Sequence, residues 1–427
     1  MEGEVSCMRA VLSIMAVTLL VAGCGRAGLG PVPPSGDYKL YTATSTQTAQ
    51  TVSVIDTRSH RVERSLPSGA PSPDWAHFYS VQAGALADLD PQTGSTRHTL
   101  PLHGDFQLPP ATISGLPGGL SQNGHWLVLQ AFDTAGDANP TATHFLVVDT
   151  SYKTVAKRID LTSYFQFDAV SNDGKRVYMI EYLPANSYHV RVFDVAGGRL
   201  DPTIIVDKSD GNAAMTGLRL AGVASPDGHW LYSMYTREKQ GAFIHALNLD
   251  GNIAFCIDLP GPGYGSGEDG LRWSLALSAD GSRLYAANGG MGTVAELDTS
   301  NGAPNLMRTV HIDNPKQSAS LLVPDVQAKG FGGDGAVLSP DGRTLVISAS
   351  TGVMWIDTAT LTATGRQLTG WTVWGLALSP NGDSLYAVSD GGMIAEMSMA
   401  GAHEASTFQG GPGQPMALLR VQAAQVP

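Results

Sequence analysis

A carboxylate or amide side chain recurs in a short polar cluster along this chain, and such a series could supply metal ligands or general bases. In "AVLSPDGRTLVISAS", Ala336 to Ser350, Asp341 lies between two apolar runs. Related clusters read "SQNGHWLVL", "SNDGKRVYM", "ASPDGHWLY", "LSADGSRLYAA" and "LSPNGDSLYAV". Carboxylate oxygens bind hard cations such as Ca²⁺ and act as general bases in catalysis. The alternative is that these residues only turn the chain at repeated points.

The residue types of the cluster favour the turn. Pro fixes φ for the first central position of a type I turn, Asp suits the next, and Gly tolerates the left-handed conformation that follows. Asp and Asn replace each other among the copies, which a turn allows and a general base does not. We therefore predict structural turn residues at Asp173, Gly174, Asp227, Gly228, Asp280, Gly281, Asp341, Gly342, Asn381 and Gly382.

The longer loops carry other residues that could contact a ligand. The neighbouring acids Glu268 and Asp269 offer hard oxygen ligands, but their loop lacks the alternating ligand spacing of a calcium loop. We therefore predict no cofactor there and favour an exposed charge pair, with Ca²⁺ or another divalent ion as the alternative. The candidate binding residues in these loops are Asp105, Phe106, Asp133, Asp137, Arg237, Tyr264, Glu268, Asp269, Arg272 and Trp273.

Other catalytic and metal signatures are missing from the sequence. The 11 histidines show neither HxxxH nor HxH spacing and have no cysteine partner, so no zinc or copper site is predicted. No Gly-x-Ser-x-Gly elbow is present for nucleophilic catalysis. The Gly-rich "GPGYGSGEDG" lacks the Lys-Ser/Thr of a phosphate-binding loop. We predict no catalytic residue and favour a protein that is not an enzyme.

The elements that would position these residues form a repeat. Each turn cluster is followed by an apolar run that ends in a polar residue, such as "FLVVDT", "TVAELDT" and "GVMWIDT", and this second motif occurs eight times. Each unit reads as four short strands, with no helical periodicity of useful length. Four-stranded units at this spacing predict an all-β fold, a β-propeller. Eight blades are favoured, and seven are the alternative if "SLPSGAPSPDW" cannot form a complete blade.

The two ends of the repeat complement each other. The first strand run, "KLYTATS", stands where the second strand of a blade would be, and the C-terminal "QPMALLRVQ" is a first strand without its own blade. Pairing of these strands would close the ring and remove the exposed sheet edge of an open array.

Two stretches also resemble a known family. "LYTATSTQTAQTVSVIDTRSHRVERSL" and "LALSPNGDSLYAVS" are similar to the repeat of YVTN-type, WD-repeat-like propellers in bacterial lipoproteins. The resemblance covers residues 38–422. It implies the propeller fold and leaves function open, since such propellers serve as binding scaffolds, lactonases and parts of cofactor-dependent dehydrogenases.

Blade topology predicts which face carries function. The first–second and third–fourth turns lie on one face of a propeller, whereas the second–third and between-blade loops lie on the other. The short turns all belong to the first group. The long loops belong to the second group and comprise residues 102–119, 131–144, 235–242, 260–273 and 312–335. We therefore expect a binding site on the long-loop face.

The N-terminus reads as an export signal. The apolar run "AVLSIMAVTLLVAG" is short for a membrane span and ends in Val21-Ala22-Gly23-Cys24, which resembles a bacterial lipoprotein box. We predict a signal peptide at 1–23, lipidation of Cys24, a Gly/Pro tether at 24–37, the propeller at 38–422 and a tail at 423–427. Glu2 and Glu4 are unusual in a signal peptide, and a start at Met8 would remove them.

Charge excludes one class of partner. The chain of 427 residues has a formal net charge of −12 and no basic stripe, so nucleic acid is not an expected partner. The leading hypothesis is an envelope-anchored propeller that binds a protein, peptide or glycan through its long-loop face and meets the membrane only through its lipid. One alternative is an extracytoplasmic lactonase-like or other metal-dependent hydrolase. Another is an accessory subunit of an envelope complex.

Overall fold

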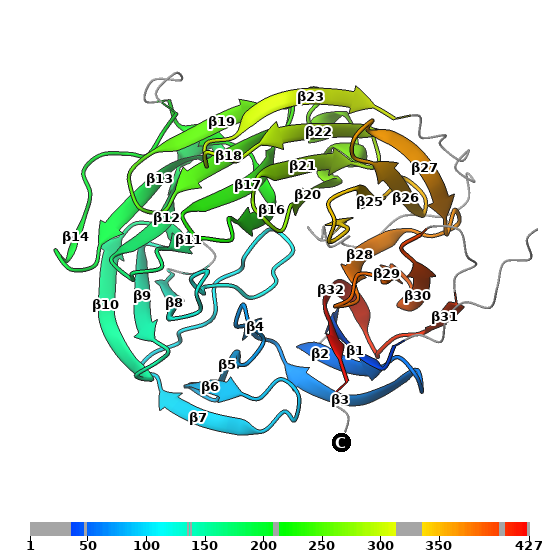
Figure 1. The fold of residues 1–427 in the computed structure, drawn as a ribbon. Coiled ribbons are helices and arrows are strands. Elements are labelled where there is room, and N and C mark those ends of the chain that lie inside the picture. The colour runs from blue at the N-terminus through cyan, green and yellow to red at the C-terminus, as the bar shows by residue number, and fades with distance from the viewer. Residues whose placement is uncertain are drawn as a thin grey trace, which may run out of the picture. The chain divides into compact units, whose positions relative to one another are not determined.

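The repeating unit of the chain is an antiparallel sheet with one strand near the centre of a ring and one at its rim (Figure 1). The computed structural model describes residues 36–46, 49–134, 136, 139–207, 213–312, 335–400 and 406–424. Eight sheets occur among these residues, and six of them have four strands. They are arranged as an eight-bladed β-propeller, so the predicted all-β class and the favoured blade number are confirmed.

Blade 1 joins the two ends of the described chain through β1 (Tyr38–Ser45), β2 (Gln50–Asp56), β3 (Arg61–Pro67) and β32 (Gln414–Ala423). Blades 2 and 3 contain β4 (Ala70–Pro71), β5 (Phe78–Gln82), β6 (Ala85–Leu89), β7 (Thr96–Pro101), β8 (Trp126–Asp133), β9 (Ala142–Asp149) and β10 (Thr154–Thr162). Blade 4 contains β11 (Phe165–Val170), β12 (Arg176–Leu183), β13 (Ser187–Asp194), β14 (Arg199–Leu200) and β15 (Met215–Thr216).

The other four blades follow the regular pattern. Blades 5 and 6 contain β16 (Leu218–Ala224), β17 (Trp230–Thr236), β18 (Phe243–Asn248), β19 (Ala254–Asp258), β20 (Trp273–Leu277), β21 (Arg283–Asn288), β22 (Thr293–Asp298) and β23 (Asn305–His311). Blades 7 and 8 contain β24 (Ala336–Leu338), β25 (Thr344–Ser348), β26 (Val353–Asp357), β27 (Thr362–Gln367), β28 (Val373–Leu378), β29 (Ser384–Ser389), β30 (Met393–Ser398) and β31 (Ser406–Gln409).

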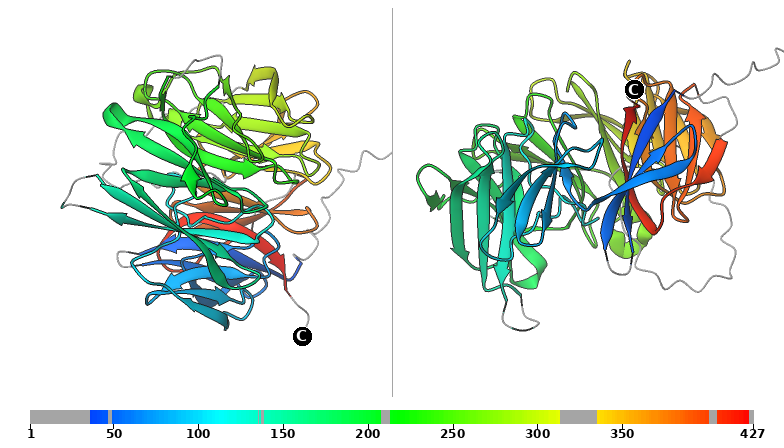
Figure 2. Two further views of the ribbon diagram at one scale, coloured as in Figure 1. Left: turned by 90° about the vertical axis from the view of Figure 1, so that its left-hand side faces the viewer. Right: turned by 90° about the horizontal axis from the view of Figure 1, so that it is seen from below.

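The ring is closed by the C-terminal strand, as predicted. β32 pairs antiparallel with β1, from Tyr38 opposite Ala423 to Ser45 opposite Gln414. The two strands lie side by side in red and blue in Figures 1 and 2. An apolar cluster then joins Leu40 of blade 1 to Tyr386 of blade 8. Because both neighbours of β1 are strands, this sheet has no open edge at the closure.

Blade 2 is complete although its first strand is short. β4 has two residues and pairs with β5. Trp75 takes the place of the usual turn glycine, with a left-handed φ of +57°, and its backbone N–H donates to Ser72 O at 2.8 Å. The Trp75 ring packs against Tyr41 of blade 1, with 4.9 Å between centroids. This apolar contact offsets the strain of a non-glycine residue in that conformation.

Two blades depart from four strands. In blade 3, β8 to β10 form three strands, and isolated bridges from Gln107 and Leu120 take the innermost place beside β8. In blade 4, β14 and β15 both pair with β13, at opposite ends of that strand. The long between-blade segments before β8 and before β16 are thus built partly into the sheets.

The core lies between neighbouring blades. The middle strands are buried on both faces, as in β2, where Val54 and Ile55 are fully buried, whereas the rim strand β3 is largely exposed. The largest core cluster joins Tyr232 and Ile244 of blade 5 to Leu284 and Ala295 of blade 6. Full burial of one such side chain contributes about 1.5–3 kcal/mol. The apolar runs therefore fix both the strands and the stacking of the blades.

The turn clusters form one repeated hydrogen-bonded turn. In blade 7, Gly342 N donates to Ser339 O at 2.8 Å, and Gly342 has a φ of +71°. Ser339 Oγ donates to Asp341 Oδ1 at 2.6 Å, and Arg343 N donates to the same oxygen at 3.1 Å. These bonds, led by that of Ser339, lower the pKa of Asp341. The equivalent serine hydroxyl donates in the same way to the side-chain oxygen of Asp173, Asp227, Asp280 and Asn381.

The second repeated motif, the apolar run that ends in a polar residue, is hydrogen-bonded to the turns of the short-turn face. Asp357 accepts a hydrogen bond from Thr360 N at 2.9 Å, and the neighbouring Thr358 Oγ1 donates to Gly342 O at 2.8 Å. Thr150 and Thr299 make the equivalent bond in blades 3 and 6. The recurring polar residues on this face thus hydrogen-bond to the turns themselves.

Helix is confined to single turns in the described part of the chain: η1 (Pro184–Asn186), η3 (Tyr264–Ser266) and η4 (Glu268–Leu271). No helix found there has the length and apolar character needed to cross a membrane.

Candidate functional site

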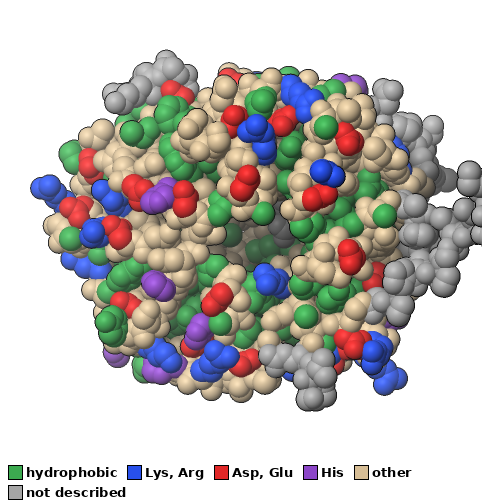
Figure 3. Space-filling view, viewed as in Figure 1, with side chains coloured by type: hydrophobic (Ala, Val, Ile, Leu, Met, Phe, Trp, Pro, Cys, Tyr) green, Lys and Arg blue, Asp and Glu red, His purple; other side chains and the backbone are tan. Residues whose placement is uncertain are grey.

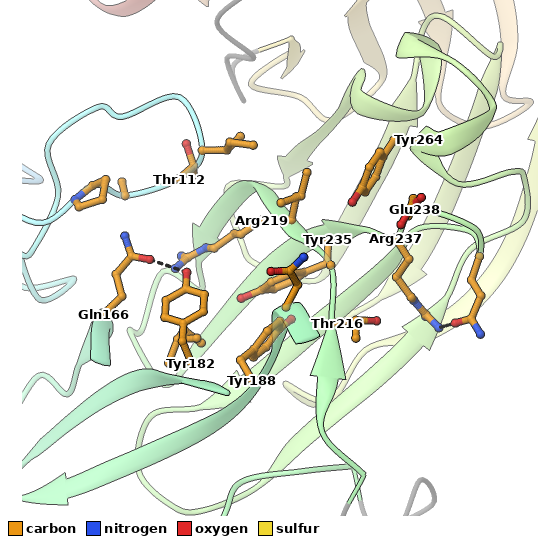
Figure 4. Close-up of a pocket in the computed structure, with 18 of the residues that line it drawn as sticks. Thr112, Gln166, Tyr182, Tyr188, Thr216, Arg219, Tyr235, Arg237, Glu238 and Tyr264 are labelled. Carbon is orange, nitrogen blue, oxygen red and sulfur yellow. Dashed lines mark hydrogen bonds between the residues drawn. The ribbon is translucent and has the colours of Figure 1, made fainter. Parts of the chain in front are cut away.

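A cavity of about 690 Å³ lies between blades 4 and 5, at the strand ends where the long loops attach. The surface of the ring is hollowed at its centre (Figure 3), and the cavity is drawn in close-up in Figure 4. Its volume falls within the roughly 300–1,000 Å³ of small-molecule sites. We call this cavity the blade 4–5 pocket.

The strands of both blades supply the floor and walls of the pocket. Gln166 stands at the start of β11, Tyr182 near the end of β12 and Tyr188 at the start of β13. Blade 5 contributes Arg219 from the start of β16 and Tyr235 from the end of β17. The start of a first strand and the end of a second strand meet at the long-loop face of a blade. The pocket therefore lies on the face where a site was expected.

A loop that is distant in the sequence from blades 4 and 5 forms one wall of the pocket. The 102–119 segment between blades 2 and 3 reaches to blade 5, where Ile113 N donates to Arg219 O at 3.1 Å. It carries a small hairpin, held by Ala111 N to Leu116 O at 2.8 Å and by a bridge between Pro110 and Pro117. Pro110 to Ile113 line the pocket, and the segment is the cyan loop inside the ring in Figure 1.

Tyrosines dominate the pocket wall. Tyr182 is 38% exposed and stacks on Tyr164, with 4.5 Å between ring centroids. Tyr188 and Tyr235 are buried and stack on each other at 6.0 Å. Burial raises the pKa of Tyr182 to about 12 and also raises the pKa values of Tyr188 and Tyr235. These phenols therefore stay uncharged at neutral pH.

A buried ion pair links the two blades behind the pocket. Arg219 Nη1 lies 2.5 Å from Asp168 Oδ1, and the Asp168 side chain is only 2% exposed. Both strands are irregular there, because the β11–β12 register shifts between Phe167 and Ala169 and the β16–β17 register shifts between Arg219 and Ala221. Such bulges re-aim side chains. The two irregular strands thus hold the Asp168 carboxylate against the Arg219 guanidinium.

His245 of β18 lies buried near this pair. Its ring meets that of Tyr235 edge-on at 6.1 Å, and its Nε2 has no hydrogen-bond partner among the described residues. Burial lowers the pKa of His245 to about 4, and the charge of Asp168 opposes this shift. The imidazole is therefore neutral at pH 7.

The second arginine of the pocket is also paired. Arg237 forms an ion pair with Asp258 and donates to Gln240 Oε1 at 2.6 Å. Its guanidinium lies 4.4 Å from the centroid of the Phe243 ring. Lys239 and Glu238 are the other charged residues of the pocket wall, one of each sign. The charges on the described lining residues and their ion-pair partners are therefore balanced.

Two of the residues predicted from the loops line this pocket, Arg237 and Tyr264. They are held together because Tyr264 N donates to Arg237 O at 2.9 Å. The adjacent Glu268 and Asp269 belong to η4 and are not part of the wall. Arg272 Nε lies 3.8 Å from Asp269 Oδ1, so this acid has a basic neighbour.

Other predicted residues lie elsewhere. Phe106 and Trp273 are each only 2% exposed and belong to apolar clusters of the core, because their loops dock on the blades through these rings. They are core residues and not parts of a binding surface. Asp105 is exposed on the 102–119 segment, and Asp133 pairs with His144 Nε2 at 3.2 Å. Asp137 and Cys24 fall outside the described residues.

The pocket offers binding groups and few catalytic ones. Among the described residues, no group of three or more His, Cys, Asp or Glu side chains could hold a metal ion. Glu238 is the single carboxylate among the described lining residues, whereas most glycoside hydrolases use two. Aromatic faces, amides and paired arginines instead resemble the lining of a ligand-binding pocket.

No local sequence pattern marks the pocket residues Gln166, Tyr182, Tyr188, Arg219 and Tyr235. Each lies in a strand, where an aromatic or long side chain is expected to pack in the core. A signal was present in the topology, since the ends of second strands meet the long-loop face. Tyr182 in "MIEYLPAN" and Tyr235 in "YSMYTRE" occupy such ends.

Comparisons with known proteins identify the fold. No family model matches the chain, and no curated protein matches it. The structure is similar to dihydro-heme d1 dehydrogenase NirN in complex with DHE, at 14% identity and a TM-score of 0.54, covering 91% of this chain and 75% of that one. It is also similar to apo AztD from Citrobacter koseri, at 13% identity and a TM-score of 0.52, covering 89% and 97%.

The periplasmic gluconolactonase PpgL of Pseudomonas aeruginosa is a further match, at 17% identity and a TM-score of 0.45, covering 90% of this chain and 99% of that one. At 14% and 13% identity, the similarities to NirN and AztD establish the propeller architecture alone.

Proposed function

We propose that this chain is a cell-envelope propeller that binds a ligand in the blade 4–5 pocket. The observation that carries the proposal is the pocket itself. It has the volume of a small-molecule site, lies on the long-loop face and is lined by tyrosines from both blades. Concave pockets with aromatic walls and a few convergent polar groups are the usual form of ligand sites.

The cellular setting is part of the proposal. The apolar run before Cys24 and its lipoprotein-like box support export and lipidation at that residue. The Gly/Pro segment that follows would hold the propeller away from the membrane. The resemblance to YVTN-type propellers is consistent with this setting and supplies no ligand.

The alternatives gain no specific support. A lactonase-like or other metal-dependent hydrolase would need acidic or histidine side chains that converge on a metal, and the described residues contain no such group. An accessory subunit of an envelope complex would need a docking surface, and no described feature points to one. Binding in the pocket is therefore the function that the described geometry favours.

The experiment is a thermal-shift screen of the purified chain against sugars, short peptides, sugar lactones and divalent ions. Thr216 is exposed in the pocket wall, so Thr216→Trp should fill the cavity without entering the core. We expect a ligand that stabilises the wild type and not Thr216→Trp. Tyr152→Ala is the matched control, because Tyr152 is 80% exposed and lies outside the pocket. Stabilisation that persists in Thr216→Trp would place binding elsewhere.

A further inference from the structure

We infer that the ligand of the blade 4–5 pocket is an uncharged sugar of one or two rings, an inference that rests on the proposed function. Three properties of the pocket wall favour such a ligand: the placement of its tyrosines, the polar groups beside them and the balance of its charges.

Two tyrosines form opposite walls. In Figure 4, Tyr182 and Tyr264 lie on opposite sides of the cavity, with Tyr235 between them. Tyr182 is 38% exposed, and its stacking on Tyr164 fixes the orientation of its ring. A sugar ring has an apolar face of C–H groups that packs on an aromatic face, and tyrosine gives a large contact area at a low entropy cost.

A hydrogen-bonding group stands beside each tyrosine. Gln166 lies next to Tyr182, whose hydroxyl donates to Gln166 Oε1 at 2.7 Å. The amide nitrogen of Gln166 supplies two donors. Glu238 lies beside Tyr264 in Figure 4 and supplies acceptors. Donors and acceptors at the edge of an aromatic face match the rim of hydroxyl groups on a sugar.

The charges disfavour an anionic ligand. Arg219 is paired with Asp168 and Arg237 with Asp258, so both guanidinium groups are neutralised by the protein. Lys239 and Glu238 add one charge of each sign, so the described lining residues and their ion-pair partners carry no net charge. The phenols of Tyr182, Tyr188 and Tyr235 stay protonated. An anion that enters a site without net positive charge loses hydration and gains no surplus of positive charge in return.

The shape disfavours an extended peptide. Peptides commonly add a strand to a free sheet edge or lie in a long groove. The pocket is instead bounded by strand ends and by the hairpin that carries Ala111, which Ile113 ties to blade 5. A compact ring fits this enclosure better than an extended chain.

The test is calorimetric titration of the full chain in detergent at pH 7. The neutral probes are glucose, galactose, mannose, N-acetylglucosamine, maltose and cellobiose. The charged probes are glucuronic acid and glucose 6-phosphate, and trialanine represents peptides. We expect a neutral sugar to bind, and Tyr182→Ala and Tyr264→Ala each to weaken it about tenfold, equivalent to ~1.4 kcal/mol. Tyr182→Phe should keep most of the affinity because it keeps the ring, and Tyr152→Ala should match the wild type.

The outcomes separate the two proposals. If only a charged probe or trialanine binds, and Thr216→Trp abolishes that binding, the pocket is a ligand site and the sugar inference is wrong. If a neutral sugar binds equally well to Tyr182→Ala and Tyr264→Ala, the sugar inference is also wrong. If no probe binds, the inference fails, and the broader thermal-shift screen then decides the proposed function by itself. Each variant is first compared with the wild type by circular dichroism, so that loss of binding is not loss of fold.

Discussion

Arg219 Nη1 lies 2.5 Å from Oδ1 of Asp168, and this pair joins the first strand of blade 5 to the first strand of blade 4. The Asp168 carboxylate is almost fully buried, so the pair forms where water is scarce. Arg219 also lines the pocket and accepts the hydrogen bond from Ile113 through its carbonyl. One arginine thus connects two blades, the pocket and the loop that crosses to it.

Breaking this pair should destabilise the fold. Asp168→Ala leaves a largely buried guanidinium without its partner, and we expect the free energy of unfolding to fall by about 3–5 kcal/mol. The double variant Asp168→Leu, Arg219→Met removes both charges and should recover much of that loss. Urea denaturation followed by circular dichroism measures all three proteins. Equal stability of Asp168→Ala and the wild type would show that the pair does not hold the blades together.

The buried His245 should lower the free energy of unfolding as the pH falls. The folded pKa of His245 is about 4, below its ordinary value of 6.5. As the pH falls, His245 is therefore protonated in the unfolded chain before it is protonated in the folded chain. Stability is therefore fully present above pH 6.5 and declines as the pH falls toward 4, by up to about 1.4 kcal/mol per pH unit. In His245→Leu, the loss between these pH values should be smaller than in the wild type. Urea midpoints at pH 7, 6 and 5 test this, and parallel curves would contradict it.

His144 should have the opposite pH dependence. Its ring nitrogens lie 2.6 Å from Asp160 Oδ1 and 3.2 Å from Asp133 Oδ2. Burial opposes the charged form, but these carboxylates together raise the pKa of His144 above 6.5. Its contribution is fully present below pH 6.5 and is lost as the pH rises through the folded value. His144→Ala should therefore cost more stability at pH 6 than at pH 9. A constant difference between variant and wild type would argue against this pairing.

Much of the fold could be predicted because its signals are local. The turn around Asp341 uses Ser, an Asp or Asn and usually Gly at fixed places, and such clusters mark most of the repeats. Counting the repeats and matching β1 to β32 then gives the closed ring. The same topology places the long loops on one face, which is where the blade 4–5 pocket lies.

The pocket residues could not be predicted in the same way because they come together from distant segments. Tyr182 and Arg219 belong to different blades, and the wall around Ile113 comes from a third part of the chain. Loop position was also a poor guide to exposure. Phe106 and Trp273 lie in long loops or at their ends, yet both anchor those segments in the core.

Two glycines of the repeated turn should differ in their tolerance of alanine. Both have positive φ values, +71° at Gly342 and +68° at Gly174, so alanine should cost about 1–2 kcal/mol at either. A Cβ at Gly342 meets nothing within 4 Å, whereas one at Gly174 would lie 2.2 Å from the Trp126 ring of blade 3. Gly174→Ala should therefore lose more stability in urea denaturation than Gly342→Ala. Equal losses would mean that the Trp126 ring moves aside freely.

The predicted lipid anchor gives a test in cells. Cys24→Ala removes the thiol that would carry the lipid, and we expect the protein to leave the membrane fraction. Cys256→Ala is the matched control because Cys256 is in β19, within the propeller. We expect the Cys256→Ala protein to stay in the membrane fraction. Fractionation and immunoblotting compare the three proteins. Retention of Cys24→Ala in the membrane fraction would exclude anchoring through this residue.

The most direct measurement of the central claim is a binding isotherm for the best ligand from the screen, recorded with the wild type, Thr216→Trp and Tyr152→Ala. The claim is that the blade 4–5 pocket between Tyr182 and Tyr264 is the ligand site. It predicts saturable binding with one site per chain, unchanged in Tyr152→Ala and lost in a folded Thr216→Trp. Full binding by Thr216→Trp would contradict it.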